Sequence, residues 1–379
     1  MSTKRLPIWL FMACLPFVDP ARAGKQEQMP GPPPFATVKS PESNADGTIT
    51  FRIWAPKASE VKLQCASLLG AQPDQMERFD EEYWRITVRP VRSGKFRYKF
   101  MVDGVQTPDP VNPLTVGTSS VVVVPGEETA FFTVRNVPHG TVHRHFYHNP
   151  AIQAVRSVSV YTPPGYEDHP DRTWPVLFLF HGSGGTDESW FQVGHANIIL
   201  DNLVAEGKAR PMIVIAPFGH TVEPGTHGWP FVQEQGDFVQ DFVEVLLPYL
   251  EKRYRISDDP HERALAGNSM GGYHTLKIGL HHLDQFANLG PFSWGGTQEF
   301  FEEDAPHVLN EPQKTRDQIE TLFIACGRDD FLFGRVQSMC RLLSDRGTEL
   351  SVFVSDGGHE MASWRRFLYE YAQRLSQDR

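Results

Sequence analysis

The segment Ala264–Gly272, with the sequence Ala-Leu-Ala-Gly-Asn-Ser-Met-Gly-Gly, constrains the fold of this chain more than any other stretch. A short apolar run ends at Gly267, and Ser269 lies between that glycine and Gly271. The pattern G-x-S-x-G is typical of a tight turn from a strand into a helix, where only small side chains fit around the serine. Such a turn lifts the hydroxyl above the sheet edge and directs the first helical amides towards the atom it attacks. Since glycine and serine also form ordinary turns, the surrounding sequence has to decide whether Ser269 is a nucleophile.

Short apolar runs alternate with helical patterns on both sides of this turn. The near-continuous apolar runs at 174–180 and 212–216 are typical of strands covered on both faces, as in a parallel sheet. Further strands are expected at 155–161, 264–266, 286–290, 321–326 and 350–354, and helices at 238–254, 270–283 and 361–375. Alternating strands and helices predict a three-layer α/β sheet with right-handed crossovers.

Residues 38–124 have a different pattern. Period-two alternation, typical of half-buried strands, occurs at 48–54, 84–88 and 96–102. Asp46-Gly47 and Asp103-Gly104 are signals for hairpin turns. This region therefore predicts a small β-sandwich of the immunoglobulin-like class.

The N-terminus has the pattern of an export signal. Two basic residues precede an apolar stretch at 6–18, and Ala21-Arg22-Ala23 fits the small-x-small cleavage rule. We expect a signal peptide over 1–23, cleaved near Ala23, and hence a secreted or periplasmic protein. The formal net charge of -10 argues against nucleic acid or an anionic membrane as a partner.

Three cysteines remain once the signal is removed: Cys65, Cys326 and Cys340. The odd number leaves at least one thiol unpaired. A disulfide between Cys326 and Cys340 stays an open alternative to two small buried side chains. No Cys/His spacing resembles a zinc site, and we expect neither a metal nor a cofactor.

Acyl transfer by a serine needs a base, a carboxylate that orients the base, and amide donors for the oxyanion. In α/β-hydrolases the order along the chain is serine, acid, histidine, each just beyond a strand. Two adjacent aspartates follow the strand at 321–326; we choose Asp330 as the acid, with Asp329 as the alternative. His359 follows a strand and two glycines and is the predicted base.

The glycine-rich segment 181–185 follows another buried strand and exposes backbone N–H groups. We assign the two oxyanion donors to the amides of Ser183 and Met270. The hydroxyl of Ser183 is a rival nucleophile, but it lacks the strand-to-helix turn.

Three residues are candidates for substrate binding. Trp229 lies in the segment 220–230, which is expected to form a lid or the edge of the substrate site. This segment contains no Arg or Lys, which favours an aromatic or neutral acyl group. Trp190 and Asn268 are the other two candidates, since one follows the glycine-rich segment and the other precedes Ser269.

Several ordered motifs of the second region resemble the esterase D-like group. They are 161–166, 181–185 with Trp190, 196–203, 207–214, the Ser269 turn, 326–330 and 357–359. This group includes carbohydrate esterase family one, with feruloyl and acetylxylan esterases, and relatives such as enterochelin esterase. In feruloyl esterases the acid is the fourth residue of a Gly-x-x-Asp turn, which supports Asp330. Asn268 stands where the group usually has leucine.

The first region resembles the early-set β-sandwich of glycogen-branching and debranching enzymes. The resemblance rests on Phe51–Pro56, Val61–Leu63, Trp84 and the segment from Tyr98 to Pro110. Such modules form family 48 of the carbohydrate-binding modules. Whether this one binds a glycan or only positions its neighbour stays open.

These resemblances imply an organisation and a function. We expect a Pro-rich spacer over 24–35, a carbohydrate-binding-module-like sandwich over 36–128 and an α/β-hydrolase esterase domain over 129–379. The expected function is that of a secreted serine esterase that removes feruloyl or acetyl groups from plant cell-wall polysaccharide such as xylan. The partner is then an acylated polysaccharide or oligosaccharide. The alternatives are a siderophore esterase of the same fold and a non-catalytic carbohydrate-binding protein.

Overall fold

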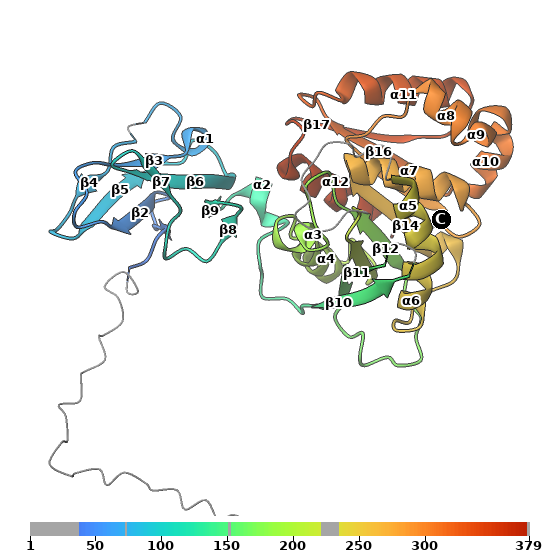
Figure 1. Cartoon of the computed structure of the whole chain (residues 1–379), viewed down its shortest axis with the longest axis horizontal. Helices are drawn as coiled ribbons and strands as arrows, with labels where there is room; N and C mark the ends of the chain where they lie inside the picture. Colours follow the sequence, from blue (N-terminus) through green and yellow to red (C-terminus); the bar gives the residue numbers. More distant parts are fainter. Residues whose placement is uncertain (1–37, 73, 151–152, 221–234, 377–379) are drawn as a thin grey trace, which may run out of the picture.

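A computed structural model describes residues 38–72, 74–150, 153–220 and 235–376. Figure 1 shows a β domain beside a larger α/β domain, with the short helix α2 (Glu127–Ala130) between them. The predicted signal peptide and the Pro-rich spacer lie outside the described residues, so both remain predictions. Within the described part of the chain, no helix is both long and apolar enough to cross a membrane.

The β domain contains two facing sheets. The first has the order β1 (Glu42–Ser43), β2 (Ile49–Trp54), β5 (Tyr83–Val88), β4 (Glu77–Arg78), and the second the order β3 (Val61–Gln64), β6 (Gly94–Val102), β9 (Ser119–Val124), β8 (Thr115–Val116), with β7 (Val105–Thr107) paired to β6. A short helix, α1 (Ala66–Leu69), follows β3. Phe51, Leu63 and Phe100 are fully buried in the core of this domain. The predicted β-sandwich is confirmed.

The hairpin between β6 and β7 shows why the Asp103-Gly104 pair predicts a tight turn. Asp103 and Gly104 have φ values of 45° and 83°, and the flanking residues Val102 and Val105 pair directly. Left-handed conformations at both central positions match the twist of antiparallel strands, and Asp and Gly tolerate them.

The α/β domain is built on one eight-stranded sheet with the order β10-β11-β13-β12-β14-β15-β16-β17. The bounds of its strands are β10 (Thr141–Asn149), β11 (Ala154–Thr162), β12 (Val176–Phe180), β13 (Ile213–Pro217), β14 (Arg263–Asn268), β15 (Asn288–Phe292), β16 (Thr321–Gly327) and β17 (Ser351–Ser355). The pairs β10–β11 and β11–β13 are antiparallel, and the remaining pairs are parallel. All six parallel strands therefore end at the same edge.

Helices cover both faces of this sheet (Figure 1), as expected for a three-layer α/β fold. One face packs against α3 (Ser189–Gln192), α4 (Ala196–Ala205) and α12 (Met361–Arg374). The other packs against α5 (Gln235–Gln240), the π-helix η2 (Asp241–Leu246), α6 (Leu247–Glu251), α7 (Met270–His281), α8 (Gln298–Glu303), α9 (Pro306–Asn310) and α11 (Phe333–Asp345). The helices α10 (Pro312–Gln318) and η3 (Pro260–Glu262) precede β16 and β14. Phe178 and Leu179, successive residues of β12, belong to the two different cores, which explains the continuous apolar run.

Two predicted elements differ from the structure. The helix expected at 238–254 is interrupted by η2, and α6 then ends at Glu251. Pro248 near the start of α6 lacks the N–H that a continuous α-helix needs at that position. The strand expected at 286–290 starts two residues later, as β15. Cys65, Cys326 and Cys340 are free thiols, so the open disulfide does not form.

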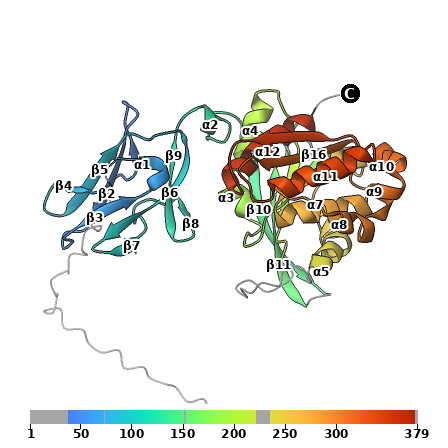
Figure 2. The same cartoon turned by 90° about the horizontal axis from the view of Figure 1, so that it is seen from above.

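Figure 2 shows the two domains side by side, joined by the segment that contains α2. They meet at a half-buried lysine, Lys95. Lys95 of β6 donates to the backbone oxygen of Val193 at 3.3 Å, and its Nζ lies 2.9 Å from Nε2 of His195. Burial lowers the pKa of Lys95 to about 8 and that of His195 to about 3. The β domain thus contacts the loop between α3 and α4.

Candidate active site

Ser269 occupies a strained turn at the carboxyl end of β14. Its φ and ψ of 54° and -116° are unusual for a residue other than glycine, and α7 starts at the next residue. The backbone N–H of Ser269 donates to the oxygen of Phe292 at 2.9 Å. A Cβ at Gly267 would lie 2.6 Å from the oxygen of Gly271, so this turn admits no larger residue there. The predicted strand–turn–helix unit is present.

Asp330 and His359 meet at the same sheet edge, beyond β16 and β17. Nδ1 of His359 lies 3.0 Å from Oδ1 and 2.9 Å from Oδ2 of Asp330. The carboxylate is buried, and its Oδ1 also accepts the backbone N–H of Leu332 at 2.8 Å. Asp329, by contrast, is exposed. Of the two adjacent aspartates, Asp330 is therefore the one in contact with the histidine.

The turns that carry this pair, residues 327–333 and 356–360, are called here the acid–base turns. They rest on close backbone contact: a Cβ at Gly327 would collide with the carbonyl oxygen of Gly357. The backbone N–H of Asp329 donates to that same oxygen at 3.0 Å, and Gly357 has a left-handed φ of 98°. Glycines before His359 thus let the two turns pack together.

Residues 181–190, called here the oxyanion segment, pass directly against Ser269. A Cβ at Gly182 would lie 3.3 Å from the Cβ of Ser269 and 2.6 Å from Nδ2 of Asn268. Ser183 is exposed, and Met270 is the first residue of α7, where backbone N–H groups have no partner inside the helix. The two predicted oxyanion donors therefore belong to segments that meet at Ser269.

A buried carboxylate anchors the oxyanion segment to the antiparallel strands. Asp187 accepts Nε and Nη2 of Arg144 at 2.9 and 3.1 Å, and the hydroxyls of Ser157 and Ser159 at 2.8 and 3.0 Å. Sequence reasoning missed Asp187, because its partners lie on β10 and β11, far away along the chain.

His181 fixes the start of the same segment. Its Nε2 accepts the backbone N–H of Gly219 at 2.8 Å, so the proton resides on Nδ1, which donates to the oxygen of Gly182 at 2.8 Å. Burial lowers the pKa of His181 to about 4, which keeps the ring neutral.

Two aromatic rings flank His359. The ring of Phe331 lies 4.5 Å away and the indole of Trp364 lies 5.0 Å away, between ring centroids. The indole N–H of Trp364 donates to the hydroxyl of Ser293 at 3.0 Å, which fixes that side. Phe331, in contrast, is 77% exposed. Neither aromatic was identified from the sequence.

The three predicted substrate-binding residues have different outcomes. Trp190 is fully buried and donates its indole N–H to the oxygen of Phe180 at 3.0 Å, so it supports the core and the expectation of substrate contact is wrong. Asn268 is buried behind Gly182, where it packs against the oxyanion segment. Trp229 lies outside the described residues, as does most of the expected lid at 220–230.

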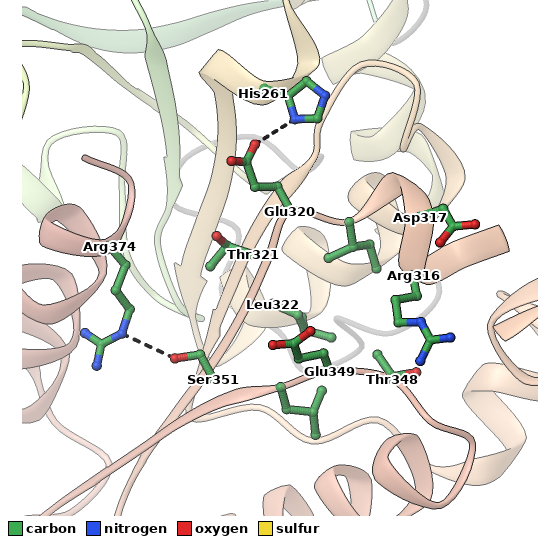
Figure 3. Close-up of a pocket in the computed structure, with 12 residues that line it drawn as sticks. His261, Arg316, Asp317, Glu320, Thr321, Leu322, Thr348, Glu349, Ser351 and Arg374 are labelled. Carbon is green, nitrogen blue, oxygen red and sulfur yellow. Dashed lines mark hydrogen bonds and ion pairs between the residues drawn. The ribbon is translucent and has the colours of Figure 1, made fainter. Parts of the chain in front are cut away.

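A polar cavity of about 650 Å³ lies at the opposite edge of the sheet (Figure 3). It is lined at the amino ends of β16 and β17, where His261 pairs with Glu320 at 2.7 Å and Arg374 contacts Ser351 at 3.3 Å. Ligands of open α/β sheets bind at the carboxyl ends of the strands. Ser269 lies at the carboxyl end of β14, whereas this cavity lies at the amino ends of the strands, so the two are separate. Among the described residues, no cluster of three or more His, Cys, Asp or Glu side chains could hold a metal ion.

Comparisons with known families match both parts of the chain. The Esterase family model matches residues 150–375, and carbohydrate-binding module 48 (isoamylase N-terminal domain) matches residues 37–120. These matches confirm both resemblances indicated by the motifs.

Individual proteins extend these matches. The endo-1,4-beta-xylanase/feruloyl esterase of Xylanibacter ruminicola is 29% identical over 366 residues, which cover 93% of this chain and 48% of that protein. The chain spans about half the length of the curated relatives that it matches first. A solved ferulic acid esterase is 27% identical with a TM-score of 0.55, over 63% of this chain and 98% of its own. The enterobactin esterase FES of Shigella flexneri, 18% identical with a TM-score of 0.60 over 86% of this chain and 93% of its own, shares the fold.

Proposed function

Because the chain belongs to the esterase family and is a carboxylic ester hydrolase, we propose that it removes feruloyl groups from plant cell-wall polysaccharide. Ser269 is the nucleophile, His359 the base and Asp330 the acid of this proposal. The observation that carries it is the hydrogen-bonded pair of His359 and Asp330 at the sheet edge where Ser269 also lies. The feruloyl group is chosen because relatives of both kinds, curated and solved, are named for it.

The geometry supports a two-step acyl transfer. Asp330 holds the Nδ1 proton of His359, so that Nε2 accepts the hydroxyl proton of Ser269. The serine oxygen attacks the ester carbonyl, and the amides of Ser183 and Met270 donate to the developing oxyanion. His359 then gives its proton to the leaving alcohol. In the second step His359 deprotonates a water molecule, which releases the carboxylic acid from Ser269.

The remaining expectations belong to the same proposal. A signal peptide over 1–23 and secretion fit a polysaccharide substrate outside the cell. The acetyl group stays the alternative acyl group. The siderophore alternative is represented by the enterobactin esterase FES, which has the same fold. Its sequence identity of 18% supports the architecture alone.

The test is hydrolysis of methyl ferulate by the purified full chain. Ser269→Ala is expected to lower kcat by about 10⁴-fold or more, because the nucleophile is lost. Ser183→Ala is the matched control: it removes the rival hydroxyl but keeps the backbone N–H, so turnover should stay within about 3-fold. Turnover that survives in Ser269→Ala and disappears in Ser183→Ala would overturn the assignment. Acetylated xylan and a catecholate ester, tested in parallel, decide between the acyl groups.

A further inference from the structure

Phe331 is the most exposed of the large apolar side chains that the structure describes. Its exposed fraction is 77%, whereas Phe292 and Phe323, on neighbouring strands of the same sheet, are fully buried. Single exposed apolar side chains are common on protein surfaces, so what distinguishes Phe331 is its position against the ring of a proposed catalytic residue, His359.

The backbone around Phe331 holds the side chain outwards. Asp330 on one side is fixed by His359, and its Oδ1 accepts the N–H of Leu332 on the other side at 2.8 Å. The N–H of Phe333 donates to the oxygen of Asp330 at 2.9 Å, and α11 starts there. These hydrogen bonds fix the backbone at Phe331, from which its side chain points outwards. The ring thus offers an exposed apolar surface beside His359.

The chemistry of the proposed function places one part of the substrate against this surface. Nδ1 of His359 faces Asp330, so Nε2 must reach the oxygen of the leaving alcohol when it delivers the proton. The alcohol fragment of the ester consequently lies next to the imidazole. The ring of Phe331 lies 4.5 Å from that imidazole, between centroids, and has a face open to solvent.

On this basis, which rests on the proposed function, we propose that Phe331 binds the sugar ring that carries the ester. The apolar C–H face of a pyranose or furanose covers an aromatic ring well, and the sugar hydroxyls stay in contact with water. The contact is made by the alcohol and not by the acyl group. Phe331 thus distinguishes a sugar ester from a simple alkyl ester of the same acid.

Two esters of ferulic acid with different alcohols test the proposal. Methyl ferulate has an alcohol too small to reach the ring, whereas a feruloylated arabinose oligosaccharide reaches it. Phe331→Ala in the full chain is expected to raise KM for the oligosaccharide by about 3- to 10-fold, the range of a ring-stacking contact, and to leave methyl ferulate within about 2-fold. Phe331→Tyr, which keeps the ring, should retain both activities. Phe146→Ala is the control: it removes another exposed ring, on β10, which is the outer strand farthest from β17. This variant should change the activity on neither ester.

The outcomes separate this inference from the proposed function. An equal loss on both esters in Phe331→Ala, or a shifted pH profile of kcat/KM, would mean that the ring positions His359 and does not bind the sugar. An unchanged KM for the oligosaccharide would also overturn the inference, with the ferulate esterase proposal intact. If the unaltered chain hydrolyses neither ester, the proposed function itself fails. Equal thermal unfolding of Phe331→Ala and the unaltered chain is expected, because the ring is exposed.

Discussion

The two regions that flank Ser269 are held by different kinds of interaction. The oxyanion segment is tied down by buried polar side chains, above all Asp187, which accepts four hydrogen bonds from β10 and β11. The acid–base turns instead rest on close backbone contact between Gly327 and Gly357 and on one carboxylate, Asp330. The difference predicts that buried charge and pH affect folding stability mainly through the first region, whereas the second region affects turnover, through Asp330 itself and through added bulk at its glycines.

The largest effect is expected from the single carboxylate of the acid–base turns. Asp330→Asn should lower kcat on methyl ferulate by about 10⁴-fold, because an amide no longer holds His359 in the tautomer that accepts the serine proton. Asp329→Asn is the control and should stay within about 3-fold, since that side chain is exposed. If the two variants lose activity equally, the contact of Asp330 with His359 does not identify the acid.

Added bulk in the same turns is expected to have the next largest effect. A Cβ at Gly327 would collide with the oxygen of Gly357, so Gly327→Ala should displace His359. Misplacement of a catalytic group by about 1 Å costs roughly 100-fold in kcat/KM. Gly334→Ala, where a Cβ meets nothing within 4 Å, is the matched control. Circular dichroism would verify that both variants fold, and an active Gly327→Ala would contradict the role of backbone contact.

The architecture could be predicted from the sequence, and so could the local turns that hold Ser269 and His359. Ser269 and His359 are surrounded by glycines that the turns require, and their order follows the strands. The choice of Asp330, with Asp329 as the alternative, was supported by the resemblance to feruloyl esterases, because two adjacent acids look alike in the sequence. Only the structure shows that one is buried against His359 and the other exposed.

The remaining residues depend on contacts between distant segments. Trp190 was assigned to the substrate, but its indole N–H is used by the oxygen of Phe180 on β12. Asp187 was missed because Arg144 meets it only after β10 and β11 pair. The exposure of Phe331 follows from the turn around Asp330. It could not be predicted from the sequence, because a phenylalanine alone does not indicate whether its side chain is buried or exposed.

Removal of the charge that anchors the oxyanion segment should have a moderate effect. Asp187→Asn leaves Arg144, whose side chain is 40% exposed, without its buried partner. We expect a loss of about 2 kcal/mol in the free energy of unfolding, measured with urea, since charged hydrogen bonds contribute roughly 1.5–3 kcal/mol each and water replaces part of them here. A several-fold fall in kcat should accompany it.

Glu188→Gln is the matched control for this variant. Glu188 also pairs with Arg144, at 2.8 Å, but from a partly exposed position. Exposed ion pairs contribute about 0–1 kcal/mol, so this variant should unfold nearly like the unaltered chain. Equal destabilisation by both variants would contradict the view that burial of Asp187 anchors the segment.

The smallest effect concerns pH and again distinguishes the two regions. Burial lowers the pKa of His181 to about 4 in the folded chain, against about 6.5 when unfolded. The unfolded state therefore binds the proton first, and the stability from neutral His181 is complete above pH 6.5 and is lost as the pH falls towards 4. Between pH 7 and 5.5 this amounts to about 1 kcal/mol. Urea unfolding at both pH values should show a smaller decrease for His181→Gln than for the unaltered chain, whereas Asp329→Asn should leave the decrease unchanged. If His181→Gln shows the full decrease, the neutral histidine that joins Gly182 to Gly219 is not the source of the pH dependence.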